Sequence, residues 1–253
     1  MERQAYEELK ELQNTHWWFV AKREIICSMV SKYSKKLLHK SKKEIQILDA
    51  GCGMGVLLHA LSRYGQVKGM DVDAEAAAYC NHIMGPKAVL QGELPDKIPY
   101  KEQSFDLIVS ADCLEHIKDD YAALCAMRKL LKEGNSFLVL TVPAFMSLWS
   151  YNDEFVHHYR RYNRKQLISL AQKAGFHVQL CSYYNFWAFP AVFIIRKMKN
   201  LFHIRKDDLG VGGGKNGLVN KILTRIFLSE KHRLLRNKRF PAGVSLILVA
   251  DIR

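Results

Sequence analysis

The chain has 253 residues and a formal net charge of +13, with 49% apolar and 25% charged residues. This composition is typical of a folded globular protein and excludes a disordered or collagen-like chain. Residues 1–150 contain 19 basic and 19 acidic side chains, whereas residues 151–253 contain 19 basic and 6 acidic ones. We therefore expect any acidic ligand or surface to be bound by the C-terminal part of the chain.

Residues 45–142 alternate short apolar runs with amphipathic stretches, which is typical of βα units on a parallel sheet. Apolar residues recur every three or four positions over residues 56–64 and 121–131, so we expect helices there. Seven strands are predicted, at residues 45–50, 66–72, 88–90, 105–110, 136–142, 177–183 and 244–252.

About 60 residues separate the last two predicted strands and fit no simple βα unit. An insertion of this length in a compact domain predicts a lid or a substrate-binding cap. Its glycine-rich segment, residues 210–217, predicts a mobile hinge.

The signals for location and metal binding are few. The charged, helix-like N-terminus MERQAYEELKEL lacks the apolar core of a secretory signal. The longest apolar stretch, about residues 180–195, is shorter than the roughly 20 residues that span a bilayer. None of the six cysteines has the C-x-x-C spacing of a zinc site. We expect a cytoplasmic protein with reduced thiols, no metal and no transmembrane segment, and with peripheral membrane contact as a further option.

The segment ILDAGCGMG joins the first predicted strand to a helix, with Asp49 at the strand end and Gly51, Gly53 and Gly55 in the turn. Glycines there permit positive φ and let the backbone approach a ligand at the carboxyl edge of the sheet. Asp71 ends the next strand, where a carboxylate can accept hydrogen bonds from both hydroxyls of a ribose. These residues predict a nucleoside-containing ligand. The G-x-G-x-G spacing differs from the G-x-G-x-x-G of dinucleotide folds. This difference weakens the case for an NAD-dependent oxidoreductase without excluding that function.

Two further loops are expected to reach the same cleft. Glu93 follows the third strand in GELPDKIP, and SADCLEHI follows the fourth strand with Asp112, Leu114 and His116.

These blocks resemble, in order and spacing, those of class I S-adenosylmethionine-dependent methyltransferases over about residues 45–145. The flanks resemble a bacterial subgroup often linked with saccharide, lipid-linked or secondary-metabolite pathways. They are HWWF at residues 16–19 with Arg23, and VPAFMSLWSYNDEFVHHYRRY at residues 142–162. The subgroup pattern D-x-x-x-x-H-x-R-R-Y is matched by Asp153, His158, Arg160, Arg161 and Tyr162.

The resemblance implies a doubly wound, seven-stranded, Rossmann-like α/β sheet with a helical cap inserted before the last strand. It implies an N-terminal helical segment over the cleft (residues 1–44), an S-adenosylmethionine-binding core (45–145), and a basic substrate-binding cap with the closing strands (146–253). The cofactor-binding residues that it implies are Asp49, Gly51, Cys52, Gly53, Gly55, Asp71, Val72, Glu93, Leu94, Asp112, Cys113 and His116.

For catalysis, His158 is the first candidate to take a proton from the acceptor, with Asp153 orienting it and His116 as a second candidate. Trp17 and Trp18 are expected to form aromatic walls that favour a sulfonium or the substrate. Arg160 and Arg161 are expected to bind an anionic group of the substrate, and Tyr162 is a third expected substrate-binding residue.

Purely structural roles stay open for these residues. The HWWF aromatics can fix the N-terminal helix to the core, the two arginines can pair with Asp153 and Glu154, and His157 and His158 can be a surface pair.

We expect methyl transfer to a small-molecule acceptor that is anionic, or linked to a lipid, prenyl chain or saccharide. A nucleic-acid methyltransferase is a competing function, but SADC stands where base-methylating enzymes commonly carry D/N-P-P-Y/F, and no appended nucleic-acid-binding module is recognisable. Two further functions compete with small-molecule methyl transfer: an NAD-dependent oxidoreductase, and a catalytically silent cofactor-binding partner of another enzyme.

Overall fold

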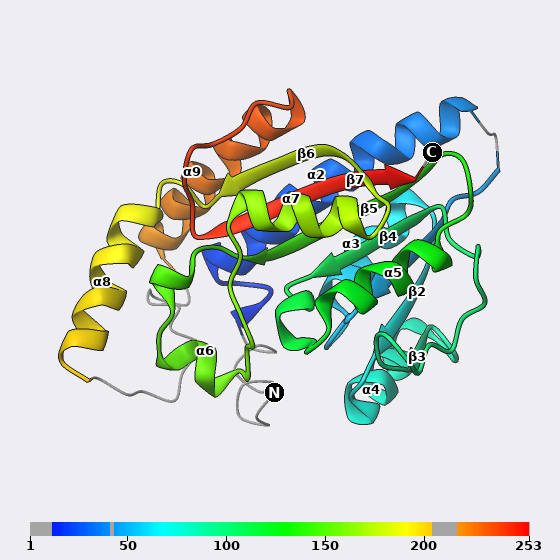
Figure 1. Ribbon diagram of the computed structural model, residues 1–253, viewed down its shortest axis with the longest axis horizontal. Helices are drawn as coiled ribbons and strands as arrows, with labels where there is room; N and C mark the ends of the chain where they lie inside the picture. Colours follow the sequence, from blue (N-terminus) through cyan, green and yellow to red (C-terminus); the bar gives the residue numbers. More distant parts are fainter. Residues whose placement is uncertain (1–11, 41–42, 204–216, 253) are drawn as a thin grey trace.

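A seven-stranded sheet forms the centre of the computed structural model, which describes residues 12–40, 43–203 and 217–252 (Figure 1). The predicted N-terminal helical stretch before residue 12 and nearly all of the predicted hinge at residues 210–217 lie outside this range. The strands are β1 (Gln46–Ala50), β2 (Gln66–Asp71), β3 (Val89–Gln91), β4 (Leu107–Ala111), β5 (Ser136–Pro143), β6 (His177–Tyr184) and β7 (Ser245–Ile252).

The strand order is β3-β2-β1-β4-β5-β7-β6. Neighbours among the first five strands are parallel, and β7 runs antiparallel to both β5 and β6. This arrangement confirms the predicted doubly wound α/β sheet of seven strands. The central strands are buried on both faces, as expected for a sheet covered by helices on each side, and β5 is buried at all of its positions.

Helices cover both faces of the sheet (Figure 1). Helices α2 (Trp17–Lys40) and α3 (Val56–Leu61) contact each other on one face, and α5 (Asp120–Leu130) and α7 (Arg164–Lys173) contact each other on the other. Helix α4 (Ala74–Met84) packs beside β3. The helix predicted at residues 56–64 ends as an α-helix at Leu61 and continues as the 3-10 turn η1 (Ser62–Tyr64).

The described part of the insertion before β7 contains two helices, α8 (Phe189–Leu201) and α9 (Leu218–Leu235). Helix α9 packs against α2, and Trp17 stacks on Phe227 with ring centroids 4.6 Å apart. The short elements η2 (Leu114–His116), η3 (Met146–Leu148) and α6 (Tyr151–Phe155) lie in the connections after β4 and β5. Within the described ranges, no helix combines the length and apolarity needed to cross a membrane.

Candidate active site

A cavity of about 1410 Å³ lies at the carboxyl ends of β1, β2 and β4. Its walls come from α2, the glycine loop after β1, η2, the segment around residues 152–161, and helices α8 and α9. The cavity therefore connects the predicted cofactor-binding residues with the insertion between β6 and β7.

The glycine loop forms one end of this cavity. Gly51, Gly53 and Gly55 have φ values of +81°, +50° and +75°, which favour glycine. A Cβ atom on Gly51 would lie 2.5 Å from Sγ of Cys113, whereas one on Gly53 would meet nothing within 4 Å. The backbone at Gly53 thus leaves open space for a ligand.

Asp71 supports the loop from the end of β2. Its Oδ2 accepts a hydrogen bond from the Gly53 amide at 2.7 Å, and its Oδ1 accepts one from the Asp73 amide at 3.0 Å. Each carboxylate oxygen has a second lone pair, so Asp71 can accept further hydrogen bonds from a ligand in the cavity.

Asp49 is a buried acceptor beside Asp71. It is 1% exposed, lines the cavity, and its Oδ2 has no hydrogen-bond partner among the described residues. Burial and the nearby Asp71 raise the pKa of Asp49 to about 7, although Lys22 opposes the shift. A cationic ligand would satisfy this oxygen and favour the ionised carboxylate.

Helix α2 contributes a charged group that the sequence patterns did not predict. The Lys22 ammonium pairs with Asp112, whose other oxygen accepts a hydrogen bond from the Thr141 hydroxyl at 2.8 Å. Burial opposes ionisation of Asp112, but the charge of Lys22 holds its pKa below the ordinary value. Lys22 lies one helical turn after Trp18, and this spacing was the available signal that both face the cleft.

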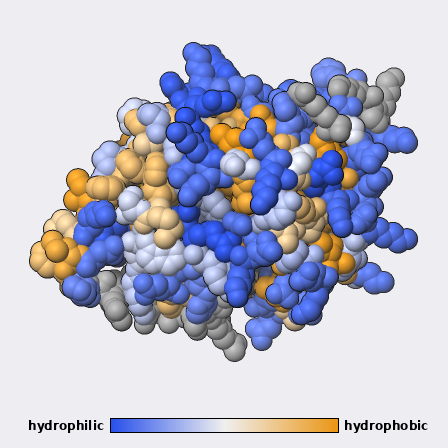
Figure 2. All heavy atoms as spheres, viewed as in Figure 1, coloured by the Kyte–Doolittle hydropathy of each residue, from blue (hydrophilic) through white to orange (hydrophobic). Residues whose placement is uncertain are grey.

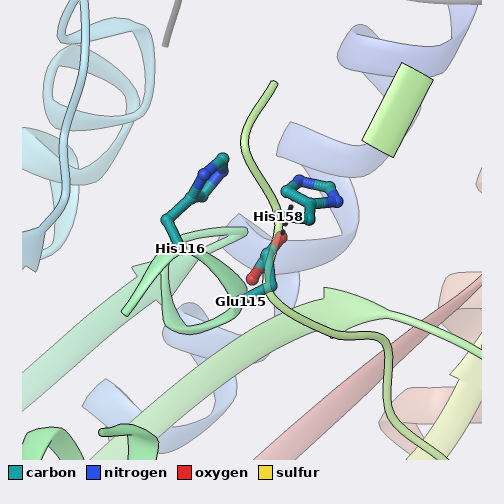
Figure 3. A group of neighbouring side chains, drawn as sticks. All are labelled: Glu115, His116 and His158. Atoms are coloured by element: carbon teal, nitrogen blue, oxygen red, sulfur yellow. Dashed lines mark ion pairs between the residues drawn. The ribbon is translucent and has the colours of Figure 1, made fainter. Parts of the chain in front are cut away.

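His158 lies at the other end of the cavity and is held by Asp153. Its Nδ1 is 2.9 Å from Oδ1 of Asp153, and its Nε2 is 3.9 Å from Oε1 of Glu115. The His116 ring meets the His158 ring edge-on, with centroids 4.6 Å apart (Figure 3). Burial, together with His158, lowers the pKa of His116 to about 4.

Asp153 is the centre of a buried ionic network. It is 1% exposed and accepts hydrogen bonds from Nε of Arg161 at 2.7 Å and Nη1 of Arg196 at 3.3 Å. Burial alone would raise the pKa of Asp153, but the bond to His158 and the two guanidinium groups lower it to about 2. Asp153 thus ties His158 to α8 as well as to its own segment.

The structure separates the predicted substrate-binding residues. Arg160 and Tyr162 do not line the cavity: the Arg160 guanidinium pairs with Asp120, and the Tyr162 hydroxyl donates to the same carboxylate at 2.8 Å. Arg161 lines the cavity but is held by Asp153, as a purely structural role predicts. Trp17 is buried against α9, and Trp18 is half-buried at the cavity wall.

Of the predicted cofactor-binding residues, Gly55 alone does not line the cavity. The others line it and are Asp49, Gly51, Cys52, Gly53, Asp71, Val72, Glu93, Leu94, Asp112, Cys113 and His116.

Residues 9–180 match a sequence model of the methyltransferase domain. The chain belongs to this methyltransferase family. The methyltransferase is 30% identical over 108 residues to norajmaline N-methyltransferase of Rauvolfia serpentina, a match that covers 40% of this chain and 37% of that protein. It is 28% identical over 132 residues to a ubiquinone biosynthesis O-methyltransferase of Xanthomonas oryzae, covering 46% of this chain and 55% of that protein. The matched region is thus only about half, or less, of the length of these relatives.

Solved structures show the same fold. A possible histamine N-methyltransferase from Thermotoga maritima aligns with a TM-score of 0.55 at 14% identity, covering 98% of this chain and 95% of that one. Phosphoethanolamine N-methyltransferase 2 of Haemonchus contortus, solved with S-adenosylmethionine, aligns with a TM-score of 0.53 at 19% identity. The alignment covers 85% of this chain and 51% of that one.

The cofactor of this methyltransferase is S-adenosylmethionine, and the cavity fits it. The unpartnered oxygen of Asp49 suits a cationic ligand, and S-adenosylmethionine carries a sulfonium and an ammonium group. The open backbone at Gly53 and the spare lone pairs of Asp71 lie at the same end.

Proposed function

We propose that the protein transfers the methyl group of S-adenosylmethionine to a small-molecule acceptor that is anionic, or linked to a lipid, prenyl chain or saccharide. The observation that carries this proposal is the single cavity that contains both Asp49 and Asp71 at one end and the His158–Asp153 pair at the other. Cofactor and acceptor would thus bind in the same cavity, where the methyl group can pass directly from one to the other.

When bound, S-adenosylmethionine supplies a methyl group that is already electrophilic, so the main task of the chain is to align the reactants. Alignment of this kind corresponds to effective molarities of about 10⁵–10⁸ M. Asp153 accepts a hydrogen bond from Nδ1–H of His158, which leaves the Nε2 lone pair facing the cavity. His158 can then take a proton from the acceptor, and His116, neutral at pH 7 with its lowered pKa, is the second candidate.

The acceptor end has a cationic and apolar entrance. Ile195 and Lys199 of α8 and Ile226 of α9 line the cavity. In the described parts of α8 and α9, Glu230 is the only acidic residue, and it is buried with its carboxylate accepting the amides of Asn185 and Phe186. The entrance therefore suits an anionic acceptor.

Apolar side chains are also unusually exposed on these helices. Ile194 is 57% exposed, Leu201 72% and Leu218 73%. Figure 2 shows apolar side chains gathered at the end of the molecule that α8 forms in Figure 1. These exposed apolar residues lie beside Lys197 and Lys221, and peripheral helices bind anionic membranes through such a combination of apolar and basic side chains. The combination supports a lipid-linked acceptor that the protein reaches from a membrane surface.

Flotation with lipid vesicles tests the acceptor class. Wild-type protein is expected to bind vesicles of phosphatidylcholine with phosphatidylglycerol and not vesicles of phosphatidylcholine alone. Lys197→Glu/Lys221→Glu is expected to lose this binding. The matched control, Lys68→Glu/Lys101→Glu, makes the same charge change at exposed lysines outside α8 and α9 and is expected to bind normally. Equal behaviour of the two double variants would reject the membrane-facing entrance.

Thermal shift and calorimetry test the reaction class. S-adenosylmethionine is expected to raise the melting temperature of the protein, whereas NAD and NADH are expected to leave it unchanged. A rise with NADH and none with S-adenosylmethionine would reject the proposed function.

A further inference from the structure

Glu115 is a buried acid that the proposed reaction leaves without a role. It belongs to η2, which two residues separate from the end of β4, and is fully buried at the cavity wall. Neither oxygen of its carboxylate has a hydrogen-bond partner among the described residues. A buried carboxylate in this state is costly unless it is neutral or meets a cation.

Two imidazoles lie beside this carboxylate. One ligand-capable atom from each of Glu115, His116 and His158 can be chosen so that all three lie within 4.8 Å of one another. Glu115 and His116 are neighbours in η2, whereas His158 comes from the segment after α6, and Figure 3 shows the Glu115 carboxylate directed at the His158 ring with the His116 ring beside them.

The surrounding hydrogen bonds hold this arrangement together. The Tyr159 amide donates to the Glu115 carbonyl at 2.8 Å, which fixes the segment carrying His158 against η2. Asp153 holds Nδ1 of His158 at 2.9 Å and leaves Nε2 directed at Glu115. A carboxylate on the far nitrogen of a histidine is the usual support of a metal-ligating imidazole.

We propose that Glu115, His116 and His158 bind one divalent transition-metal ion at the acceptor end of the cavity. Two imidazole nitrogens and one carboxylate oxygen favour ions such as zinc, cobalt or iron over magnesium or calcium. Bonds of about 2.0–2.2 Å place the ligand atoms of a tetrahedral site roughly 3.3–3.6 Å apart, so side-chain rotations that bring the three atoms closer by up to about 1.5 Å would close the site. Three protein ligands leave coordination positions open for an acceptor.

The role of the ion rests on the proposed methyl transfer. An acceptor hydroxyl that coordinates the ion becomes more acidic and releases its proton to water. The oxygen lone pair then forms the bond to the methyl carbon, while the electron pair of the carbon–sulfur bond stays on sulfur, which becomes a neutral thioether. With the ion bound, both histidines are ligands, and the ion replaces His158 in activating the acceptor.

Cobalt titration of chelator-treated, full-length protein tests the site without any acceptor. Wild-type protein is expected to bind one Co²⁺ per chain by calorimetry and to develop the visible absorption of cobalt with nitrogen and oxygen ligands. Glu115→Gln and His158→Gln are expected to bind Co²⁺ at least 10-fold more weakly. The matched control is His157→Gln, which changes the adjacent, exposed histidine and is expected to bind as the wild type does.

Three results would each overturn the metal site: no Co²⁺ binding by the wild type, undiminished binding by Glu115→Gln, or equal loss in His157→Gln. Circular dichroism and the melting temperature establish that each variant is folded, and His116→Asn replaces any variant that is not. Loss of the metal site with intact S-adenosylmethionine binding leaves the proposed function standing, whereas failure of wild-type protein to bind S-adenosylmethionine rejects that function.

Discussion

The two ends of the cavity are constructed differently. At the cofactor end, Asp49 and Asp71 lie at the ends of neighbouring parallel strands, and Asp71 accepts a hydrogen bond from the Gly53 amide of the glycine loop. At the acceptor end, Asp153 joins His158, Arg161 and Arg196 in one buried ionic network. Residues at the first end can be changed one at a time with local effects, whereas those at the second end depend on one another.

Asp153→Ala is the strongest test of this difference. It leaves the guanidinium groups of Arg161 and Arg196 without their carboxylate, and loss of one partner of a buried pair costs about 3–5 kcal/mol. We expect the free energy of unfolding, measured with urea, to fall by this amount while S-adenosylmethionine affinity changes little. Glu154→Ala, at the exposed neighbouring acid, is the control. A loss below about 1 kcal/mol would show that the network is not a unit.

Asp71→Asn tests the cofactor end with a change that preserves shape. Hydrogen bonds to a charged group contribute about 1.5–3 kcal/mol, so calorimetry is expected to show S-adenosylmethionine binding weakened roughly 10- to 100-fold. Glu102→Gln, an exposed acid that does not line the cavity, is expected to leave the affinity unchanged. Unchanged affinity in Asp71→Asn would place the cofactor elsewhere.

The pH dependence of cofactor binding reports on Asp49. Its pKa is raised to about 7, so the carboxylate is mostly neutral at pH 6 and mostly ionised at pH 8. A cationic cofactor favours the ionised form, and we expect affinity to rise by up to about tenfold across this range. Asp49→Asn is expected to flatten the profile. A profile that falls with pH in wild-type protein would contradict a cation beside Asp49.

Arg160→Ala is expected to have the smallest effect. Arg160 does not line the cavity, and its partly exposed guanidinium donates to the carbonyls of Ile117 and Lys118. We expect the free energy of unfolding to fall by about 1 kcal/mol with no change in cofactor affinity. A loss as large as that of Asp153→Ala would extend the buried network to this arginine.

The sheet and the cofactor end were predictable because they depend on local patterns. The apolar runs in the sequence predicted all seven strands. Asp49 was indicated by the glycines that follow the first strand, and Asp71 by its place at the end of the second strand. Parallel strands bring such ends to one edge of the sheet whatever lies between them.

The acceptor end was less predictable because its contacts join distant segments. Asp153 and Arg196 are 43 residues apart in the chain, and nothing near Arg196 indicates its partner. Glu115 was visible within the L-E-H segment, but its isolation from hydrogen-bond donors emerges only once η2 is packed. The bounds of α8 and α9 were not predicted because apolar residues on these helices face both the cavity and solvent.

Helix α2 contacts both ends of the cavity. Lys22 reaches Asp112 at the cofactor end, while the Trp17 amide donates to Asn220 of α9 and the Trp17 ring stacks on Phe227. A ligand that shifts α2 from one end must therefore alter the free energy of binding at the other. If cofactor and acceptor both shift α2, thermodynamic reciprocity requires each to change the other's affinity by the same factor, so α2 is the element that would couple the two binding events.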